Sequence, residues 1–464
     1  MPFPMTDDLY NFDVFPRVFR VGKEAEIHVR QLGARPVFLP GESYKLIVCA
    51  LEGGHPAEFP ATGDYRAREV TADEEGNFAF THTFDSEQEY FLRFEKLSGE
   101  RIIQFPVYAV EDDLADRMPY LGDLHMHTCR SDGGQLPAVV AANYRAHGYD
   151  FTVISDHHRY YPSLEAIEAY KDLPHELAII PGEEVHMPPV HGHGNAVHIV
   201  NFGGEYSINA LTEGEAVREK GTDPKYRSLN GVCPPSVPLS EYEDNMEKLA
   251  ASLELPEGVD AIPAAVCKWV FTEIKKAGGL GIFAHPTWIA NAFHVPEKFT
   301  DYLMKERDFD AFEVLGGENY YEQNGFQTHR YYDERAKGNN FPIVGSTDSH
   351  SSLTSNRNAL ICSTIVFAEK NERKALISAI KDYYSVAVDT ISAEFRLVGD
   401  TRLARYACFL LKNYFPLHDS LCAEEGRLMK RYVTGLPEER EEAKKTMEVM
   451  NGRVAKLQKK LFAF

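Results

Sequence analysis

Residues 120–127 read YLGDLHMH, an apolar run that leads directly into two histidines, His125 and His127. Successive side chains of a β-strand point to opposite faces, so residues two apart lie on the same face. A strand here would present both imidazoles to one point in space, where two neutral imidazoles can hold a metal ion. Taken alone, the pair is equally compatible with two unrelated polar residues, so the surrounding sequence has to decide.

A repeat of apolar strands and amphipathic helices continues from this stretch. Candidate helices at residues 136–148 and 163–173 alternate with short apolar strands. This alternation predicts parallel β/α architecture, in which the strand ends and following loops carry function. The repeat is interrupted at residues 205–265 by a segment rich in Pro, Gly, Ser and charge, and it resumes over residues 271–350. The insertion is either a lid or specificity loop, or a solvent-exposed decoration.

Potential metal ligands stand in or at the ends of several of these strands. Side chains at the ends of successive parallel strands converge on one mouth of a barrel, so a shared site explains the series better than chance does. Mixed imidazole and carboxylate sets suit zinc, manganese or iron rather than calcium. The set exceeds the needs of one tetrahedral ion, which implies more than one ion. The residues are His125, His127, Asp132, Asp156, His157, His158, Glu183, Glu184, His186, His198, His285, Asp348 and His350.

The order of these motifs resembles the polymerase-and-histidinol-phosphatase (PHP) family of metallo-phosphoesterases. The shared pattern is D-x-H-x-H-(x4)-D-G, S-D-H, P-G-x-E, a strand histidine, A-H-P and a closing D-x-H, over about residues 119–365. The resemblance implies a distorted seven-stranded β/α barrel, placed at residues 117–398, that hydrolyses phosphate esters at a trinuclear metal centre.

The resemblance also implies how the ligands are shared among three divalent ions. Glu184 would bridge two of the ions. The implied groups are His125, His127, Glu184 and Asp348 for the first ion, Asp132, His157 and His350 for another, and His198 and His285 with the bridging Glu184 for the third.

Two positions depart from the family pattern. Many relatives have G-S-D-x-H where this chain has GSTDSH at residues 345–350. The added Thr347 leaves the D-x-H pair intact, so we expect it to alter the approach loop rather than ligation. Asp132 stands where some relatives carry His, which makes the site harder and favours manganese or iron over zinc.

The expected reaction is attack on phosphorus by a hydroxide that bridges two ions, while a nearby acid protonates the leaving alkoxide. Asp123, Asp156 and His158 are the candidates for catalytic proton transfer, with Glu183 and His186 beside them. For each of these residues, the alternative is to orient an imidazole that binds metal.

Arg130 and Arg159 flank the first two motifs and are candidates to bind the substrate phosphate, because a guanidinium matches phosphate geometry. A surface ion pair is the alternative for either. The expected substrate is a small phosphorylated molecule. Two rival functions are metal-dependent hydrolysis of C–N or C–O bonds, as in amidohydrolases, and a non-catalytic metal-binding scaffold.

The regions on either side of this repeat have patterns of their own, and the N-terminal one contains no cluster of metal-ligand or nucleophile residues. Residues 1–116 contain short segments with period-two alternation, separated by turn signals, which predicts a small antiparallel β-sandwich. The sandwich is either a packing module or a binder of carbohydrate or a partner. Residues 399–464 show helical spacing of apolar positions, so we expect a helical extension that packs on the barrel or on another copy of the chain, giving a homo-oligomer.

The composition limits the remaining function classes. The 464 residues include 49 Lys and Arg and 70 Asp and Glu, a net charge of −21, which disfavours duplex nucleic acid and anionic membranes as partners. The 7 cysteines form no CxxC pair, which argues against a disulfide framework or a zinc ribbon. The first residues lack the pattern of a signal peptide, and no apolar run is long enough for a membrane span, so a cytoplasmic location is expected.

Overall fold

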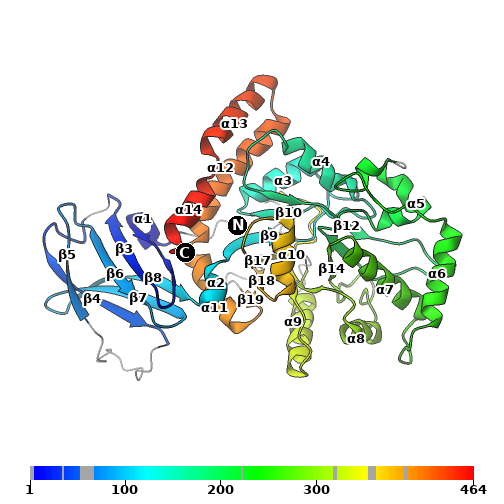
Figure 1. Ribbon diagram of the computed structural model, residues 1–464, viewed down its shortest axis with the longest axis horizontal. Coiled ribbons are helices and arrows are strands. Elements are labelled where there is room, and N and C mark those ends of the chain that lie inside the picture. Colours follow the sequence, from blue (N-terminus) through cyan, green and yellow to red (C-terminus); the bar gives the residue numbers. More distant parts are fainter. Residues whose placement is uncertain are drawn as a thin grey trace. The chain divides into compact units, whose positions relative to one another are not determined.

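The protein is a mixed α/β structure in which the chain forms two compact units (Figure 1). The first unit combines Met1–Met118 with Ala404–Leu421 and Gly452–Phe464, and the second combines Pro119–Leu403 with Cys422–Asn451. The computed structural model describes residues 5–33, 36–52, 67–220, 223–316, 321–353, 362–390 and 396–464.

The described residues of the first unit form two β-sheets. Three strands form one sheet in the order β1-β3-β6, and five form the other in the order β2-β8-β7-β4-β5. The pairs are antiparallel apart from β2 and β8. The strands are β1 (Phe12–Phe15), β2 (Val18–Arg20), β3 (Glu24–Gln31), β4 (Ser43–Ala50), β5 (Ala67–Thr71), β6 (Phe78–Thr83), β7 (Gln88–Lys96) and β8 (Arg101–Val110).

An aromatic core lies between the two sheets. Alternate residues of β7 are buried, as expected for a strand with one face toward the core. Phe94 of β7 is fully buried, and its ring lies 4.9 Å from that of Phe78 and 5.0 Å from that of Phe38. Side chains of both sheets contribute to this one core, so the sheets form a sandwich.

The C-terminal helices are divided between the two units. The unit boundaries assign residues 404–421 and 452–464 to the first unit, where the ring of Tyr406 lies 5.0 Å from that of Tyr108 of β8. Residues 422–451 belong to the second unit. The expected extension over residues 399–464 is therefore helical but is no separate body. The helices are α11 (Thr401–Asn413), α12 (Phe415–Thr434), α13 (Pro437–Met450) and α14 (Arg453–Leu461), besides α1 (Asp7–Asn11) and α2 (Asp112–Ala115) in the first unit.

The second unit also contains two sheets. Their strand orders are β11-β10-β9-β17-β18-β19 and β12-β13-β14-β15-β16. The strands of the first are β9 (Met118–Asp123), β10 (Phe151–Val153), β11 (Ala178–Ile180), β17 (Cys362–Ala368), β18 (Ser385–Asp389) and β19 (Arg396–Val398). Those of the second are β12 (Gly182–Val185), β13 (Ile199–Phe202), β14 (Leu280–Phe283), β15 (Ala311–Leu315) and β16 (Ile343–Gly345).

Strand directions in the second unit are mixed, whereas the sequence predicted a parallel arrangement. Strands β9, β10 and β11 are parallel, as are β14, β15 and β16. Strand β13 is antiparallel to both β12 and β14, and β18 is antiparallel to β17 and β19. The connection from β12 to β13 holds no helix, and a parallel crossover normally needs one.

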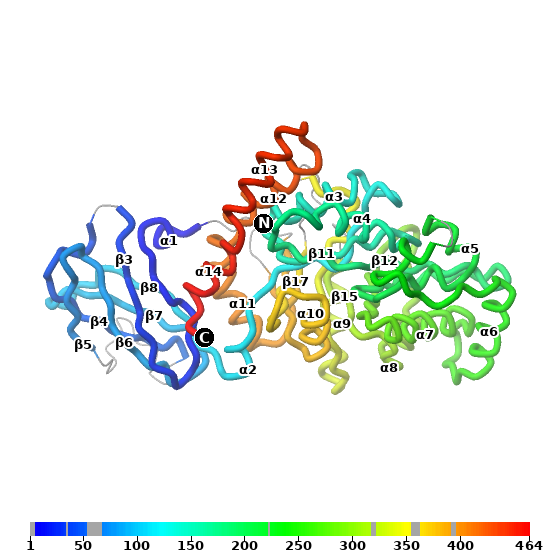
Figure 2. Tube along the Cα trace, turned by 45° about the horizontal axis from the view of Figure 1, so that its top comes forward, coloured from blue at the N-terminus to red at the C-terminus, as the bar shows by residue number. Residues whose placement is uncertain are grey.

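Helices cover the sheets of the second unit. Figures 1 and 2 show α3 and α4 on one side of the strands and α7 and α8 on the other. The helices are α3 (Pro137–Ala146), α4 (Tyr161–Tyr170), α5 (Glu213–Ala216), α6 (Leu239–Ala251), α7 (Ala261–Lys276), α8 (Glu297–Glu306), α9 (Tyr321–Ala336) and α10 (Arg373–Lys381), with 3-10 turns η1 (Asn209–Leu211), η2 (Val217–Glu219) and η3 (Pro224–Tyr226).

Helix α12 packs closely against α3 in the second unit (Figure 2). A Cβ on Gly426 would lie only 2.1 Å from the backbone nitrogen of Ala146, so a larger residue would force the helices apart. The contact is reinforced by Arg145, which is fully buried and lies 2.7 Å from the carboxylate of Glu425. These contacts explain why residues 422–451 belong to this unit.

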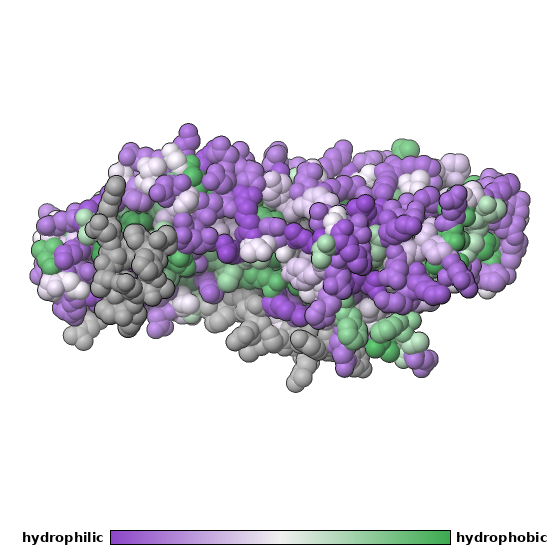
Figure 3. All heavy atoms as spheres, turned by 90° about the horizontal axis from the view of Figure 1, so that it is seen from below, coloured by the Kyte–Doolittle hydropathy of each residue, from purple (hydrophilic) through white to green (hydrophobic). Residues whose placement is uncertain are grey.

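Hydrophilic residues cover most of the face drawn in Figure 3. None of the helices in the described part of the chain combines the length and apolar character that a membrane span needs.

Candidate metal centre

His125 and His127 follow directly after β9, as the sequence predicted. Both side chains are almost completely buried. The backbone N–H of His127 donates to the carbonyl of Ser349, 2.9 Å away, which joins the end of β9 to the loop that carries Asp348 and His350. The two motifs with two-residue spacing therefore lie side by side although more than 200 residues separate them in the chain.

The first group consists of His125, His127, Glu184 and Asp348, whose possible ligand atoms all lie within 4.8 Å of one another. Nε2 of His127 lies 2.9 Å from Oδ1 of Asp348 and 3.4 Å from Oε2 of Glu184. Nε2 of His125 lies 3.2 Å from the same Glu184 oxygen. Two imidazoles and two carboxylates thus point at one centre.

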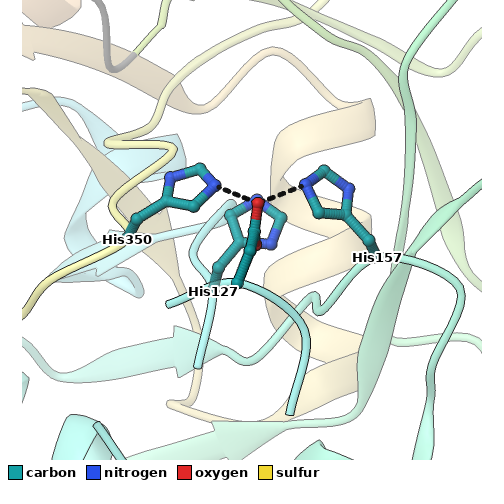
Figure 4. Close-up of side chains that lie close together, drawn as sticks. His127, His157 and His350 are labelled. Carbon is teal, nitrogen blue, oxygen red and sulfur yellow. Dashed lines mark ion pairs between the residues drawn. The ribbon is translucent and has the colours of Figure 1, made fainter. Parts of the chain in front are cut away.

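The second group consists of His127, Asp132, His157 and His350. Oδ2 of Asp132 lies 3.5 Å from Nε2 of His157 and 3.3 Å from Nε2 of His350. Figure 4 shows the three imidazole rings facing a shared region, with these two ion pairs as dashed lines. The Asp132 side chain is 54% exposed and that of His350 is 41% exposed, so this group forms the open side of the cluster.

The third group consists of His198, His285 and His294. His198 and His285 were predicted, but His294 was not. Nδ1 of His198 lies 2.6 Å from Oε1 of Glu184, so this group adjoins the first. His294 lies in the loop before α8, where no periodic pattern singles out one polar residue.

The two carboxylate oxygens of Glu184 face different groups. Oε2 faces His125, His127 and His157, whereas Oε1 faces His198 and His186. Glu184 is fully buried. A carboxylate with oxygens directed to two sides is the arrangement that a bridge between two cations requires.

Electrostatics at the centre are dominated by burial and by this surplus of carboxylates. Burial alone would lower the pKa of His125, but Asp348, Glu313 and Glu184 together raise it well above its ordinary value. At His157, burial also lowers the pKa, but the neighbouring carboxylates raise it by more, so the pKa of this imidazole is raised to about 9. Positive charge is therefore favoured at these two imidazoles, as a proton or as a bound cation.

The residues present fit divalent metal ions. His285 is 3% exposed, yet neither of its ring nitrogens has a hydrogen-bond partner, and the same holds for Nδ1 of His127. Buried polar atoms normally have a partner, so these nitrogens call for a ligand. Burial lowers the pKa of His285 to about 3, which keeps this imidazole in the neutral form that binds metal.

Glu313 of β15 also belongs to the centre, although the sequence interpretation missed it. Its Oε2 lies 3.0 Å from Nδ1 of His125, and both residues are fully buried. A carboxylate on the second ring nitrogen fixes the tautomer and orientation of a metal-binding histidine. The available signal was a single acidic residue inside the apolar segment AFEVL, which a buried strand does not hold without a partner.

Asp123 is hydrogen-bonded to both segments that carry the ligands with two-residue spacing. Its Oδ1 accepts hydrogen bonds from the backbone N–H of Thr347 at 3.0 Å and of His125 at 3.2 Å, and the Thr347 hydroxyl donates to its other oxygen. Burial raises the pKa of Asp123 to about 7. These contacts favour an orienting role over proton transfer, and they give the additional Thr347 a defined function as the partner of Asp123.

Asp156 is likewise engaged by the loop that follows His127. It accepts hydrogen bonds from the backbone N–H of Thr128 at 3.0 Å and of Ser131 at 2.9 Å, and from both hydroxyl groups. All of these donors belong to the segment that leads to Asp132. The geometry therefore favours the orienting alternative for Asp156.

The first part of the insertion is built into the centre. Glu183 accepts hydrogen bonds from the side chains of Ser207 at 2.7 Å and Asn209 at 2.8 Å. The Asn209 side chain also accepts from the backbone N–H of His186, and Glu215 lies 3.0 Å from Nδ1 of His158. Residues 207–219 thus support the residues of the site. From the sequence we expected either a lid or specificity loop or a solvent-exposed decoration, and this part of the insertion is neither.

Glu219 extends this support to helix α4. Its carboxylate accepts hydrogen bonds from the backbone N–H groups of Tyr160 and Tyr161, where the helix begins. Burial, followed by the charge of Glu183, raises the pKa of Glu219 to about 8. An acceptor at a helix N-terminus satisfies N–H groups that the helix itself leaves unpaired.

The two candidate phosphate-binding arginines have different surroundings. Arg130 forms a two-point ion pair with Glu165, with nitrogen–oxygen distances of 2.9 and 2.7 Å. This is the ion-pair alternative of the sequence interpretation. The guanidinium of Arg159 has no hydrogen bond or ion pair with any residue that the structure describes, so Arg159 is the better candidate for binding an anion.

Two of the predicted ligands have strained backbone conformations. His285 has φ of 23° and Asp348 has φ of 46°, in a region that residues other than glycine seldom occupy. Such strain persists only where the surrounding structure enforces it, and it concentrates at functional sites.

Comparison with known proteins gives matches among solved structures alone. Neither a family model nor a curated protein matches the chain. A two-domain protein from Bacteroides vulgatus, containing a predicted PHP-like metal-dependent phosphoesterase, is 18% identical with a TM-score of 0.37. The match covers 59% of this chain and 65% of that protein, which is less than two thirds of its length.

Two further solved structures are similar at the same level. A proposed metal-dependent phosphoesterase from Bifidobacterium adolescentis is 20% identical over 49% of this chain and 87% of its own, with a TM-score of 0.31. An amidohydrolase from Chromobacterium violaceum is 18% identical over 50% of this chain and 87% of its own, with a TM-score of 0.30. The similar structures thus include one protein described as containing a predicted PHP-like phosphoesterase and one described as a proposed metal-dependent phosphoesterase. The function of this chain is inferred from the site itself.

Proposed function

We propose that the chain is a PHP-type metal-dependent phosphoesterase that hydrolyses a small phosphate ester at the strand ends of a distorted β/α barrel. The observation that carries this proposal is the placement of Glu184 between groups of imidazoles, with one carboxylate oxygen directed to each side. A single structural ion would need neither the second side nor so many donors.

Three divalent ions fit the three groups of donors. The first group holds two imidazoles and two carboxylates, the open group adds Asp132, His157 and His350, and the third holds His198 and His285 beside Glu184. Zinc, manganese and iron all accept such mixed nitrogen and oxygen ligands. When bound, the ions would supply a nucleophile at neutral pH and neutralise charge on the phosphoryl oxygens and the leaving group.

The chain's own residues prepare the centre for this chemistry. Glu313 fixes the ring of His125 so that Nε2 faces the other ligands. Asp123 and Asp156 hold the loops that carry Asp348 and Asp132. The exposed edges of Asp132 and His350 leave one side of the cluster open to a substrate, and the guanidinium of Arg159 offers a positive charge for its phosphate.

The test compares the full-length, metal-loaded protein with its His127→Ala and Asp348→Ala variants on an aryl phosphate and on an aryl amide and a lactone. The wild-type protein should release phosphate, and each variant should be slower by on the order of 1000-fold, because several kcal/mol of charge stabilisation is lost. His191→Ala is the matched control, because His191 is half exposed and pairs with Glu243 and Glu247.

Two results would contradict the proposal. Amide or lactone hydrolysis without phosphate release would assign the site to the rival hydrolase class. Phosphate release at wild-type rates from a variant that has kept its metal content would place the chemistry elsewhere in the molecule.

A further inference from the structure

The loop between β14 and α8 folds back on itself after His285. The N–H of Trp288 donates to the carbonyl of His285 at 3.0 Å, and the N–H of His294 donates to the carbonyl of Trp288 at 2.7 Å. Ile289 and Phe293 form a bridge across the loop. This turn returns the chain to its starting point, so His294 lies beside His285 although eight residues separate them.

His294 lies against the third ligand group. Its ring centre is 4.2 Å from that of His198, at an angle of 80°, and 6.4 Å from that of His285, at an angle of 23°. One possible ligand atom from each of these three residues lies within 4.8 Å of the others. The ring of Trp288 packs against His294 at 4.8 Å and helps to fix its orientation.

Two of the three imidazoles at this end lack hydrogen-bond partners among the described residues. Both ring nitrogens of the buried His285 have no hydrogen bond, and the His294 ring forms none with the residues that the structure describes. The nearest carboxylate to His285 is that of Asp348, whose Oδ2 lies 3.6 Å from Nε2, beyond hydrogen-bond distance. Buried imidazole nitrogens without a hydrogen bond are unfavourable unless a cation lies between them. The carboxylate Oε1 of Glu184 completes the set from the side of His198.

We propose that His294 is a ligand of the metal ion at this end of the centre, together with His198, His285 and Glu184. The inference rests on the proposed function in so far as that function requires metal ions. Three imidazoles and one carboxylate are a complete four-coordinate set, which is characteristic of a zinc site that holds its ion firmly. The ion at this end would thus be held by less exposed side chains than the ion at the open side, where Asp132 is 54% exposed and His350 is 41% exposed.

The experiment measures metal content and affinity without substrate. Purified full-length protein is dialysed against a chelator of graded strength, and bound zinc is counted by mass spectrometry for wild type, His294→Ala and His294→Gln. His198→Ala is the reference for a lost ligand, and Asn291→Ala, in the same loop and exposed, is the matched control. Circular dichroism and the melting temperature of the chelated proteins establish that each variant is folded.

Both His294 variants should lose one equivalent of metal, or bind it at least about 10–100-fold more weakly, as His198→Ala does. In cobalt-loaded protein, the visible absorption bands should change in the His294 variants and stay unchanged in Asn291→Ala. Wild-type metal content, affinity and cobalt spectrum in folded His294 variants would overturn the inference. Wild-type protein that binds metal but releases no phosphate would refute the proposed function and leave this inference standing, whereas wild-type protein that binds no metal would refute both.

Discussion

The sandwich of the first unit and the strand ends of the second unit bury side chains of opposite character. Between the sandwich sheets, the buried residues include a cluster of aromatic rings around Phe94. At the strand ends of the second unit, the residues that are entirely buried include His125, Glu184 and Glu313. Burial of an apolar ring is favourable by itself, whereas burial of a charged group is tolerated only with partners.

This contrast separates stability from function within one chain. In the sandwich, a residue can be replaced by another of similar size and polarity, because the contacts are nondirectional. In the metal centre, the buried polar atoms face specific donors and acceptors, and the nitrogens without a hydrogen bond call for a cation, so a change of one atom type disrupts the arrangement. Four predictions test how strictly the two regions differ.

The largest expected effect is on the stability of the sandwich. Phe94→Ala should lower the free energy of unfolding of this unit by about 3–5 kcal/mol, because it removes a fully buried ring from an aromatic cluster. Metal content per folded molecule should stay unchanged. Chemical denaturation with fluorescence and metal analysis would measure both quantities, with the exposed Leu97→Ala as control. Loss of metal in folded Phe94→Ala protein would show that metal binding in the second unit depends on the packing of the sandwich core.

A pH-dependent effect is expected at Glu219. The pKa of Glu219 is raised to about 8 in the folded chain, so between pH 4.5 and 8 the folded chain keeps a proton that the unfolded chain releases. This contribution to stability is complete at low pH and is lost as the pH rises, by about 3–4 kcal/mol between pH 5 and pH 8.

Glu219→Gln should remove that pH dependence, because glutamine does not titrate. Urea unfolding at pH 5, 6, 7 and 8 would measure it, with the exposed Glu213→Gln as control. If the free energy of unfolding falls with rising pH by the same amount in the variant and in the wild type, the titrating group is not Glu219.

A smaller effect is expected at Glu313. Glu313→Gln keeps the size of the side chain but removes the negative charge beside His125, so metal affinity should fall by about 10–100-fold. Competition with a chelator would measure the change, and Glu306→Gln on the exposed side of α8 is the control. Unchanged affinity would mean that this buried carboxylate, like the sandwich core, serves packing alone.

The smallest effect is expected at Arg130. Its ion pair with Glu165 is about one third exposed on both sides, and such pairs contribute about 1 kcal/mol or less. Arg130→Ala should therefore leave stability within that limit and change KM on a phosphate substrate by less than about fivefold. A much larger rise in KM would indicate that Arg130 binds the substrate phosphate, and Arg159 would then be the weaker candidate.

The sequence predicted best what depends on local patterns. Apolar runs located the strands whose ends lead to the ligands: His125 and His127 lie just beyond β9, and Asp348 and His350 lie beyond β16. The sandwich strands were visible for the same reason. The antiparallel course of β13 was not, because it depends on how the helix-free connection over residues 186–198 returns to the sheet.

Partners set by distant parts of the chain were beyond the reach of the sequence. Glu313 and His294 carry no motif, and their role arises only when β15 and the loop before α8 lie beside β9 and β13. The engagement of Asp156 with Thr128 and Ser131 is of the same kind. A hydrogen-bonded role of this sort is a property of the folded neighbourhood, whereas a ligand type at a strand end is a property of the local sequence.

The position of Glu184 has a consequence for how the centre would fill. One carboxylate carries a single negative charge, and its two oxygens face different groups, so cations on the two sides would share that charge. Occupation of one side would change the affinity of the other, and the two effects must be equal in free energy. Metal titration of this protein should therefore be cooperative, in either direction, rather than a sum of independent binding events.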